Sequence, residues 1–274
     1  KKTLWFVAFA ITLVLAIYQR LTGPTHPLRG KIKLADEEIS YRLKRSATCG
    51  KGAEISLKAP DGVTGVLHYR RHLSNDLWLT KPMSREKEKL LALLPEQPPA
   101  GKMQYKVFLL KGDETGIIDV DGGPIILRYK GSVHVSILLP HILFMFAAMV
   151  LSARAGLEAF DKEGKPQWYA MATLFCLVLG GFILGPLVQK SAFGAYWTGW
   201  PFGSDLTDNK AAIALFAWIY GVYAARREGR GRGAVMLAAL IMMAVYLIPH
   251  SLKGSEIDHR AGKAINAVPT AVNR

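Results

Sequence analysis

The chain has 274 residues, half of them hydrophobic, and carries a formal net charge of +14 at pH 7. This length allows for two compact units, and the positive mean hydropathy favours a membrane protein over a soluble one. The two cysteines, Cys49 and Cys176, are expected to lie in different parts of the fold, which excludes a disulfide framework and a thiolate metal site.

Five apolar runs, nearly free of charge, predict five membrane-spanning helices, because about 20 apolar residues cross a bilayer. They cover residues 4–18, 133–151, 168–188, 211–225 and 234–249. The first and fourth runs are short, so either can be an interfacial segment instead of a full span. The first run follows Lys1 and Lys2 and lacks a small-residue cleavage site, which favours an uncleaved anchor over a signal peptide.

The charges of the short connecting loops predict the orientation of these helices. Loops rich in lysine and arginine stay in the cytoplasm, whereas long exported domains are exempt from this rule. The positive loops hold Arg154, Lys162, Lys165, Arg226, Arg227, Arg230 and Arg232. Residues 189–210 hold only Lys190 and Lys210. We therefore expect the N-terminus inside, and residues 21–132, the loop 194–210 and the C-terminal tail outside.

Residues 21–132 are predicted to form an exported antiparallel β-sandwich. Alternating runs indicate strands at residues 54–58, 65–70, 103–109 and 124–129. Turn residues separate them at positions 60–62, 111–113 and 121–124. The segment SREKEKLLALL, residues 84–94, suits either a helical turn or a strand with a charged lead-in. The basic excess of this domain favours anionic headgroups or an acidic protein as its partner, and no nucleic acid is expected outside the cell.

Three segments of this domain follow one another in the order LHYRR at residues 67–71, Leu77 with Trp78, and LPEQPPAGKMQY at residues 94–105. This order resembles fibronectin type III and related immunoglobulin-like modules. The resemblance covers residues 50–130 and implies a binding or spacing unit. His68 and His72 share one face of a strand through their even spacing, which permits a metal pair, but no third ligand is evident and the sequence favours solvated strand histidines.

The segment GAYWTGWPFGSDLTDNK, residues 194–210, connects the third and fourth apolar runs at the predicted outer surface. Its aromatic residues are Tyr196, Trp197, Trp200 and Phe202. It also carries two carboxylates, Asp205 and Asp208. We expect Thr207 or Asp208 to be the N-cap of the following helix, which leaves Asp205 without an obvious structural role.

Two histidines are predicted to lie at the same outer surface. His141 follows Pro140 at the start of the second run, and His250 follows Pro249 at the end of the fifth. We expect both prolines to mark helix boundaries. Imidazole ligates haem iron, and large aromatic rings supply the flat apolar walls that a porphyrin needs.

The loop and its histidines resemble the haem-handling membrane proteins of cytochrome c biogenesis, whose outward tryptophan-rich loop is flanked by histidines. The resemblance is carried by residues 193–210, and the spacing differs from the family's because Thr198 and Gly199 separate the two tryptophans. It implies a location in a bacterial inner membrane, haem b as cofactor, and a cytochrome as partner of the exported domain. The residues that it implies as haem contacts are His141, His250, Trp197, Trp200, Tyr196 and Asp205.

An aromatic belt is the alternative, because Trp and Tyr are enriched at membrane interfaces. This interpretation explains Trp197, Trp200 and Trp218 without any ligand. It leaves Asp205 as the carboxylate of most interest in the loop.

Two further groups of residues have a structural and a functional interpretation. Gly180, Gly181 and Gly185 predict a flat strip on the third helix for close packing against a neighbour. The tail carries Glu256, Asp258 and His259, which suit a solvated acidic turn better than a metal site.

The sequence thus predicts a membrane α-helical protein with five transmembrane helices plus an exported all-β immunoglobulin-like sandwich domain. The predicted parts are an anchor (1–20), the β-domain (21–132), a four-helix unit (133–250) and an outer tail (251–274). The expected function is haem binding, haem delivery or electron transfer at the outer face. The alternative is a non-catalytic subunit or scaffold of a larger membrane complex.

Two other classes of function are weaker. Few polar residues lie within the apolar runs, which argues against a transporter or channel. Phosphate-binding loops, dinucleotide fingerprints, zinc-protease helices and nucleophile elbows are absent from the sequence. An enzyme would have to use Asp205, Glu256 and Asp258 as its carboxylates.

Overall fold

The computed structural model describes residues 1–226, 231–250, 252–260 and 263–265. The chain divides into two compact units, and each is described by itself. The helical unit comprises Lys1–Pro24, Val133–Ser191 and Ala195–Gly254. The β unit comprises Thr25–Ser132, Ala192–Gly194 and the described residues from Ser255 onwards. Arg227, Arg230, Ser251 and part of the predicted tail (261–262 and 266–274) lie outside the described residues.

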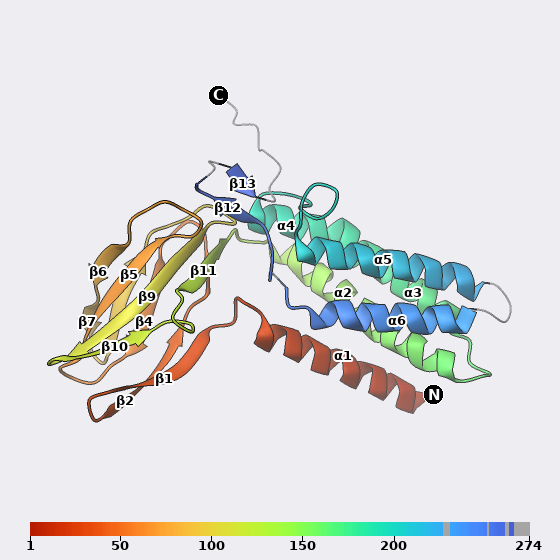
Figure 1. Cartoon of the computed structure of the whole chain (residues 1–274). Coiled ribbons are helices and arrows are strands. Elements are labelled where there is room, and N and C mark those ends of the chain that lie inside the picture. Colours follow the sequence, from red (N-terminus) through yellow and green to blue (C-terminus); the bar gives the residue numbers. More distant parts are fainter. Residues whose placement is uncertain (227–230, 251, 261–262, 266–274) are drawn as a thin grey trace. The chain divides into compact units, whose positions relative to one another are not determined.

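Helices cover all five predicted apolar runs (Figure 1). They are α1 (Lys2–Thr22), α2 (Val135–Phe160), α3 (Gln167–Leu177), the π-helical segment η1 (Val178–Leu184), α4 (Gly185–Phe193), α5 (Leu206–Ala225) and α6 (Gly231–Leu247). Among the described residues, α1, α2 and the continuous segment Gln167–Phe193 are long and apolar enough to cross a membrane. The helix α6 is apolar but shorter. Membrane crossing by α5 and α6 stays a prediction.

The helix α2 corrects two sequence-based expectations. It begins at Val135 with His134 as N-cap, so Pro140 lies inside the helix and does not mark its start. It also continues to Phe160, which places Arg154 within the helix and not in a loop. Arg154 is only 1 % exposed, and its Nη2 lies 2.6 Å from Oε2 of Glu158 one turn further on. The pairing explains how a charged residue is tolerated in this buried place.

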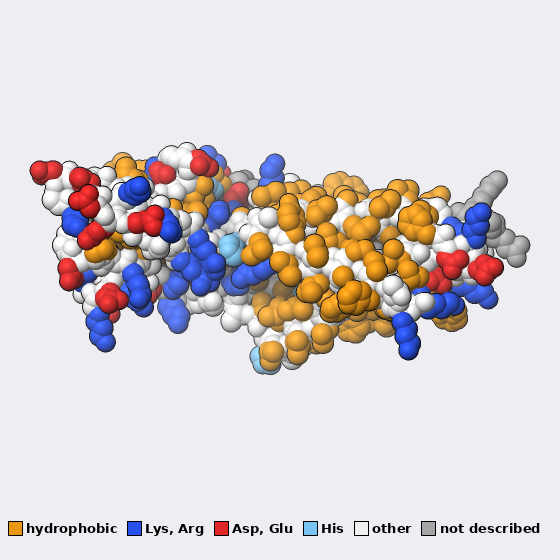
Figure 2. All heavy atoms as spheres, turned by 90° about the horizontal axis from the view of Figure 1, so that it is seen from below, with side chains coloured by type: hydrophobic (Ala, Val, Ile, Leu, Met, Phe, Trp, Pro, Cys, Tyr) orange, Lys and Arg blue, Asp and Glu red, His pale blue; other side chains and the backbone are white. Residues whose placement is uncertain are grey.

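Small residues bring the helices into close contact. A Cβ added to Gly180 would lie 2.9 Å from Sδ of Met145 on α2, which confirms the predicted role of this glycine in packing. A Cβ added to Gly156 of α2 would lie 2.8 Å from Cβ of Ala239 on α6. Large hydrophobic side chains lie on the outside of the unit, where they cover the face of the helices seen in Figure 2. Such an exterior is typical of a protein surrounded by lipid.

Eleven strands precede α2 in the chain, all in the β unit. They are β1 (Leu28–Leu34), β2 (Glu37–Leu43), β3 (Ser46–Thr48), β4 (Ala53–Lys58), β5 (Thr64–Arg71), β6 (Leu79–Pro82), β7 (Ser84–Glu86), β8 (Lys89–Leu94), β9 (Lys102–Lys111), β10 (Glu114–Ile118) and β11 (Ile125–Lys130). The largest sheet has the order β3-β11-β9-β5-β6, with β10 also paired to β9. Separate ladders are formed by β4-β8-β7 and by β1-β2.

The four strands predicted from alternation are confirmed as β4, β5, β9 and β11. Gly62, Gly112 and Gly122 have positive φ angles, which confirms the predicted turns. Residues 84–94 form the hairpin β7-β8, so the strand interpretation of this segment is the correct one. One pair departs from the antiparallel expectation, because β3 runs parallel to β11. All of these strands except β6 and β7 contribute residues to one hydrophobic core, so a β domain accompanies the helices.

From Ser255 onwards, the described part of the tail belongs to the β unit. Its strand β12 (Glu256–Asp258) pairs with β13 (Lys263–Ile265). Asp258 is 6 % exposed, and Nζ of Lys102 lies 2.5 Å from a carboxylate oxygen of Glu256. The backbone carbonyl of Ser255 accepts a hydrogen bond of 2.7 Å from Arg128. The expectation of a solvated acidic turn is therefore wrong, because this segment is a strand that an ion pair and a hydrogen bond fix to the rest of the β unit.

Candidate functional site

The aromatic loop lies between α4 and α5 and is built around the first turn of α5. Asp208 reaches back from this turn, and its Oδ2 accepts hydrogen bonds from the backbone N–H groups of Thr198 at 2.6 Å and Gly199 at 2.9 Å. The side-chain amide of Gln189 on α4 donates a third, at 3.0 Å. Asp208 is only 5 % exposed, so these bonds replace the water that the carboxylate gives up.

Asp205 is the N-cap of α5. The expectation that Thr207 or Asp208 would have this role is wrong. Oδ1 of Asp205 accepts a hydrogen bond of 2.8 Å from the N–H of Thr207, and its other oxygen accepts one of 3.2 Å from the hydroxyl of Thr198. Asp205 is 3 % exposed. The carboxylate that seemed to lack a structural role therefore closes the helix end and holds the loop.

Backbone geometry explains why glycine and asparagine occur in this loop. A Cβ at Gly199 would lie 2.5 Å from Cβ of Asp208, so no larger residue fits against the helix there. The side-chain oxygen of Asn209 accepts a hydrogen bond of 2.6 Å from the N–H of Trp200. Three consecutive backbone N–H groups, those of residues 198, 199 and 200, are thus fixed by side chains of the first turn of α5.

The loop directs its aromatic side chains to different places. The indole of Trp197 is half-buried, stacks at 5.7 Å on Phe182 of η1 and donates to the carbonyl of Trp200. The other three are exposed, namely Tyr196 (56 %), Trp200 (73 %) and Phe202 (74 %). The third tryptophan considered for an aromatic belt, Trp218, is fully buried, and its indole N–H lies 3.1 Å from Sδ of Met242. Trp218 is therefore a core residue.

His141 has a defined tautomer. Its Nδ1 lies 2.8 Å from the carbonyl oxygen of Gly180, which can only accept, so Nδ1 carries the proton and Nε2 keeps its lone pair. Gly180 belongs to the π-helical segment, where its carbonyl also accepts from the N–H of Gly185 five residues on. Such π-helical segments occur frequently at functional sites.

The C-terminal end of α6 lies near this histidine. Nζ of Lys210 donates a hydrogen bond of 2.7 Å to the carbonyl of Ile248, and Gln19 of α1 donates to the carbonyl of Tyr246 at 2.9 Å. These side chains satisfy carbonyls that a helix end leaves without partners. His250 follows with an exposed side chain, close enough to Lys210 and His141 for both to act on it electrostatically.

The site therefore meets some requirements of haem and fails others. A metal-binding histidine typically donates its second N–H to a backbone carbonyl, and His141 does so. His250, the second implied ligand, lies within electrostatic range of it. Trp197 and Asp205 do not fit their implied roles as well, because the indole packs on Phe182 and the carboxylate caps α5. His141 therefore has the hydrogen bond of a metal ligand, whereas the loop does not supply a haem wall.

The candidate residues of the β unit have structural partners. The ring of His68 packs on Phe108, with centroids 4.7 Å apart. Nδ1 of His72 lies 3.1 Å from the amide of Gln104. Burial lowers the pKa of His72, and the nearby charge of Lys102 adds to this effect, so the ring is neutral at pH 7. The rings of His68 and His72 therefore have different partners within the β unit.

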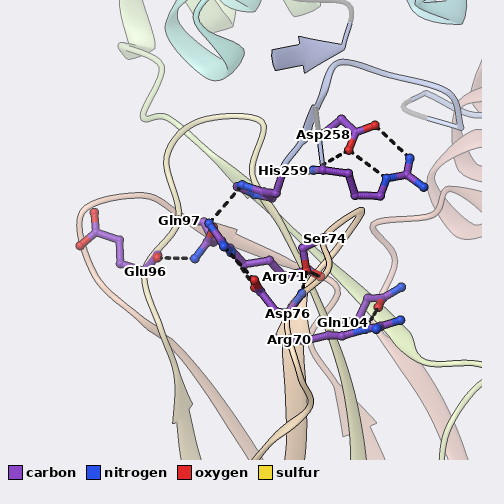
Figure 3. Close-up of polar contacts among 10 residues, drawn as sticks. Arg70, Arg71, Ser74, Asp76, Glu96, Gln97, Gln104, Asp258 and His259 are labelled. Carbon is purple, nitrogen blue, oxygen red and sulfur yellow. Dashed lines mark hydrogen bonds and ion pairs between the residues drawn. The ribbon is translucent and has the colours of Figure 1, made fainter. Parts of the chain in front are cut away.

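The tail residue His259 lies in a separate polar cluster (Figure 3). Arg71 forms two hydrogen bonds with Asp76, at 2.7 and 2.8 Å, and its Nη1 lies 3.3 Å from Nδ1 of His259. Asp258 pairs with Arg260. In the described part of the chain, no three His, Cys, Asp or Glu side chains are grouped as a metal ion requires.

Comparisons with protein families, with curated proteins and with solved structures find no match to this chain. The account of the site therefore depends on its geometry alone.

Sequence reasoning missed several residues that hold the loop. Gln189, Thr198 and Asn209 each donate or accept a hydrogen bond inside it, and Lys210 closes α6. The spacing of Asp205 and Asp208 could have indicated that these carboxylates hold the loop. The first is at the N-cap, and the second is three residues later, where a carboxylate can reach back to the preceding loop. The loop residues that bond these carboxylates, such as Thr198, follow no sequence pattern that would identify them.

Replacing Asp208 by Asn tests whether its charge holds the loop. The amide still offers one acceptor, but hydrogen bonds to a charged group are about twice as strong as neutral ones, so we expect the free energy of unfolding to fall by about 2 kcal/mol. Thermal unfolding of the detergent-purified protein measures this change. Glu163→Gln, an exposed position with the same loss of charge, is the control. Equal stability of both variants would contradict the assignment.

Proposed function

We propose that this chain is an integral membrane protein in which α5 and α6 cross the bilayer together with the three longer helices. The distribution of apolar side chains supports this proposal. On α5, Phe216 and Ile219 are exposed while Trp218 is buried, and on α6 Leu237 and Leu240 are exposed while Met242 is buried. A helix that is apolar on its outward face as well as its inward face suits contact with lipid.

The proposed orientation follows from the charges at the two ends of the helical unit. Lys162 and Lys165 lie between α2 and α3, and Arg226 and Arg232 lie at the facing ends of α5 and α6. These charges favour a cytoplasmic location, with the β unit and the aromatic loop outside. The membrane is proposed to be a bacterial inner membrane, and the β unit is proposed to be immunoglobulin-like.

The function that the geometry supports best is that of a non-catalytic membrane subunit or scaffold. The observation that carries this proposal is the loop itself, in which buried Asp205 and Asp208 fix the backbone while Tyr196, Trp200 and Phe202 point outwards. Exposed aromatic side chains on a rigid backbone are the usual anchors of protein interfaces, because little conformational entropy is lost when they bind. Membrane lipids and other membrane or exported proteins are the proposed partners.

The double substitution Trp200→Ala and Phe202→Ala tests this function. If the loop anchors a partner, the wild-type protein will run in native gels of solubilised native membranes as part of a larger complex, and the double variant will lose it. Its own thermal stability should stay within about 0.5 kcal/mol, because both side chains are exposed. Trp168→Ala, another exposed tryptophan, is the control and should keep the complex. A wild-type protein that runs alone would refute the proposal.

A second candidate function is haem binding at His141 and His250, which is favoured by the hydrogen bond from Nδ1 of His141 to a backbone carbonyl, because it leaves Nε2 of this ring free to bind a metal. Haem bound there would supply one-electron chemistry, and these residues would hold its iron. Protein purified with ample haem should then show a Soret band. The band should be lost in His141→Ala and in His250→Ala, and kept in His134→Ala. A featureless wild-type spectrum would exclude this function.

A further inference from the structure

The tail segment Ser255–Arg260 contacts three strands of the β unit through polar groups. At its start, Arg128 of β11 donates to the carbonyl of Ser255 at 2.7 Å, and Lys102 of β9 pairs with Glu256 at 2.5 Å. No residue of this segment, which the structure describes completely, belongs to the hydrophobic cluster of the β unit. The segment is therefore held mainly by polar contacts, and such contacts depend on the protonation state of the groups that make them.

The far end of the segment lies against the last residue of β5 (Figure 3). There, Nε and Nη2 of Arg71 donate to the carboxylate of Asp76 at 2.7 and 2.8 Å. The remaining nitrogen of the guanidinium, Nη1, lies 3.3 Å from Nδ1 of His259. A guanidinium can only donate, so Nδ1 of His259 must accept. The ring is therefore neutral and carries its proton on Nε2.

The loop after β5 meets the tail at a second point. The hydroxyl of Ser74 donates to the carbonyl of Arg71 at 2.8 Å, which holds the loop against the strand end. The carbonyl of Leu73 accepts a hydrogen bond of 3.2 Å from the N–H of Arg260. The tail thus bonds this loop through the side chain of His259 and through the backbone of the residue that follows it.

Protonation of His259 removes the first of these bonds. A proton on Nδ1 points at Nη1 of Arg71, so two donors and two positive charges then meet. Burial and Arg71 lower the pKa of His259, and they outweigh Asp76 and Asp258, the two carboxylates near the ring. Neither carboxylate bonds Nε2, which is buried without a hydrogen-bond partner among the described residues. The docked tail therefore favours the neutral ring.

A lowered pKa in the docked state means that acid weakens docking. Above pH 6.5 the ring is neutral whether the tail is docked or free, so docking displaces no proton. Below pH 6.5 the free tail binds a proton that the docked tail excludes, and the docking equilibrium falls as the pH falls. For a histidine of ordinary pKa, about 6.5, this loss reaches up to about thirtyfold at pH 5.

A second histidine near the tail acts in the opposite sense. Nε2 of His72 lies 3.7 Å from a carboxylate oxygen of Glu256, so a charged ring at this position would attract the tail. Burial lowers the pKa of His72, and the charge of Lys102 adds to this effect. Loss of docking in acid would therefore identify His259, and not His72, as the responsible group.

We propose that residues 255–260 form an acid-released latch, which is docked on the β unit while His259 is neutral and is released as this ring binds a proton. Release separates Glu256 from Lys102 and uncovers positive charge on the β unit. Histidine is suited to this role because its ordinary pKa lies close to neutral pH. The latch needs neither a partner nor haem, so it is independent of both proposed functions.

Hydrogen–deuterium exchange of the full chain in detergent, at pH 7.5 and at pH 5.0, measures docking. Each rate is compared with that of an unstructured peptide at the same pH, which removes the intrinsic effect of pH on exchange. We expect the protection of the Arg260 amide to fall at least about tenfold at pH 5.0. Amides of β9 (Lys102–Lys111) should keep their protection, because carboxyl groups ordinarily stay ionised at pH 5.

The variant His259→Gln supplies the matched comparison, because its amide oxygen can still accept from Arg71 but cannot bind a proton at these pH values. Protection of Arg260 in this variant should change less than about twofold between the two pH values. His68→Gln alters a histidine that packs on Phe108 and should keep the wild-type response. Equal protection in the wild type at both pH values, or a tenfold loss that persists in His259→Gln, would overturn the proposal.

A titration of the wild-type protein gives a readout that does not depend on docking of the variant. Nuclear magnetic resonance of protein with ¹³C-labelled histidine follows the ring of His259 directly. We expect its pKa to lie below 6.5, the ordinary value for histidine. A pKa of 6.5 or above would overturn the proposal, even if the tail of His259→Gln is unprotected at both pH values.

Discussion

The carboxylate of Asp208 is the group on which the end of the helical unit that carries the aromatic loop depends. It is buried in the first turn of α5 and accepts hydrogen bonds from two successive backbone N–H groups of the aromatic loop and from Gln189 of α4. A buried carboxylate without such partners would be costly, and buried N–H groups without an acceptor would be equally so. The loop and the helix start therefore stabilise each other, and the outward direction of Trp200 follows from this mutual requirement.

The same principle explains the polar groups around the loop. Backbone groups at helix ends near a membrane have little access to water, so side chains of other helices must satisfy them. Lys210 of α5 and Gln19 of α1 donate to the last carbonyls of α6, and His141 of α2 donates to the π-helical segment. Two of the residues that the sequence suggested as haem contacts thus have structural roles first, since Asp205 caps α5 and His141 bonds the π-helical segment. The groups that remain available to bind a ligand or partner are Nε2 of His141 and the exposed aromatic rings of the loop.

Periodicity was enough to predict the helices, four of the strands and the glycine turns, because each is specified by neighbouring residues. Contacts between distant segments could not be predicted in this way. The N-cap role of Asp205 requires knowledge of the path of residues 198–204, and the burial of Arg154 depends on its partner Glu158. The attachment of Glu256 to Lys102 joins residues 154 positions apart, and no local pattern signals it.

Amide hydrogen exchange of the protein in lipid nanodiscs would test the central interaction most directly. If the Asp208 carboxylate holds the loop, the N–H groups of Thr198 and Gly199 should exchange at least about 1,000-fold more slowly than in an unstructured peptide, although both lie outside any helix or strand. Exchange of these two amides at the rate of an unstructured peptide would contradict the account, because the aromatic side chains would then lack the rigid backbone on which their proposed role depends.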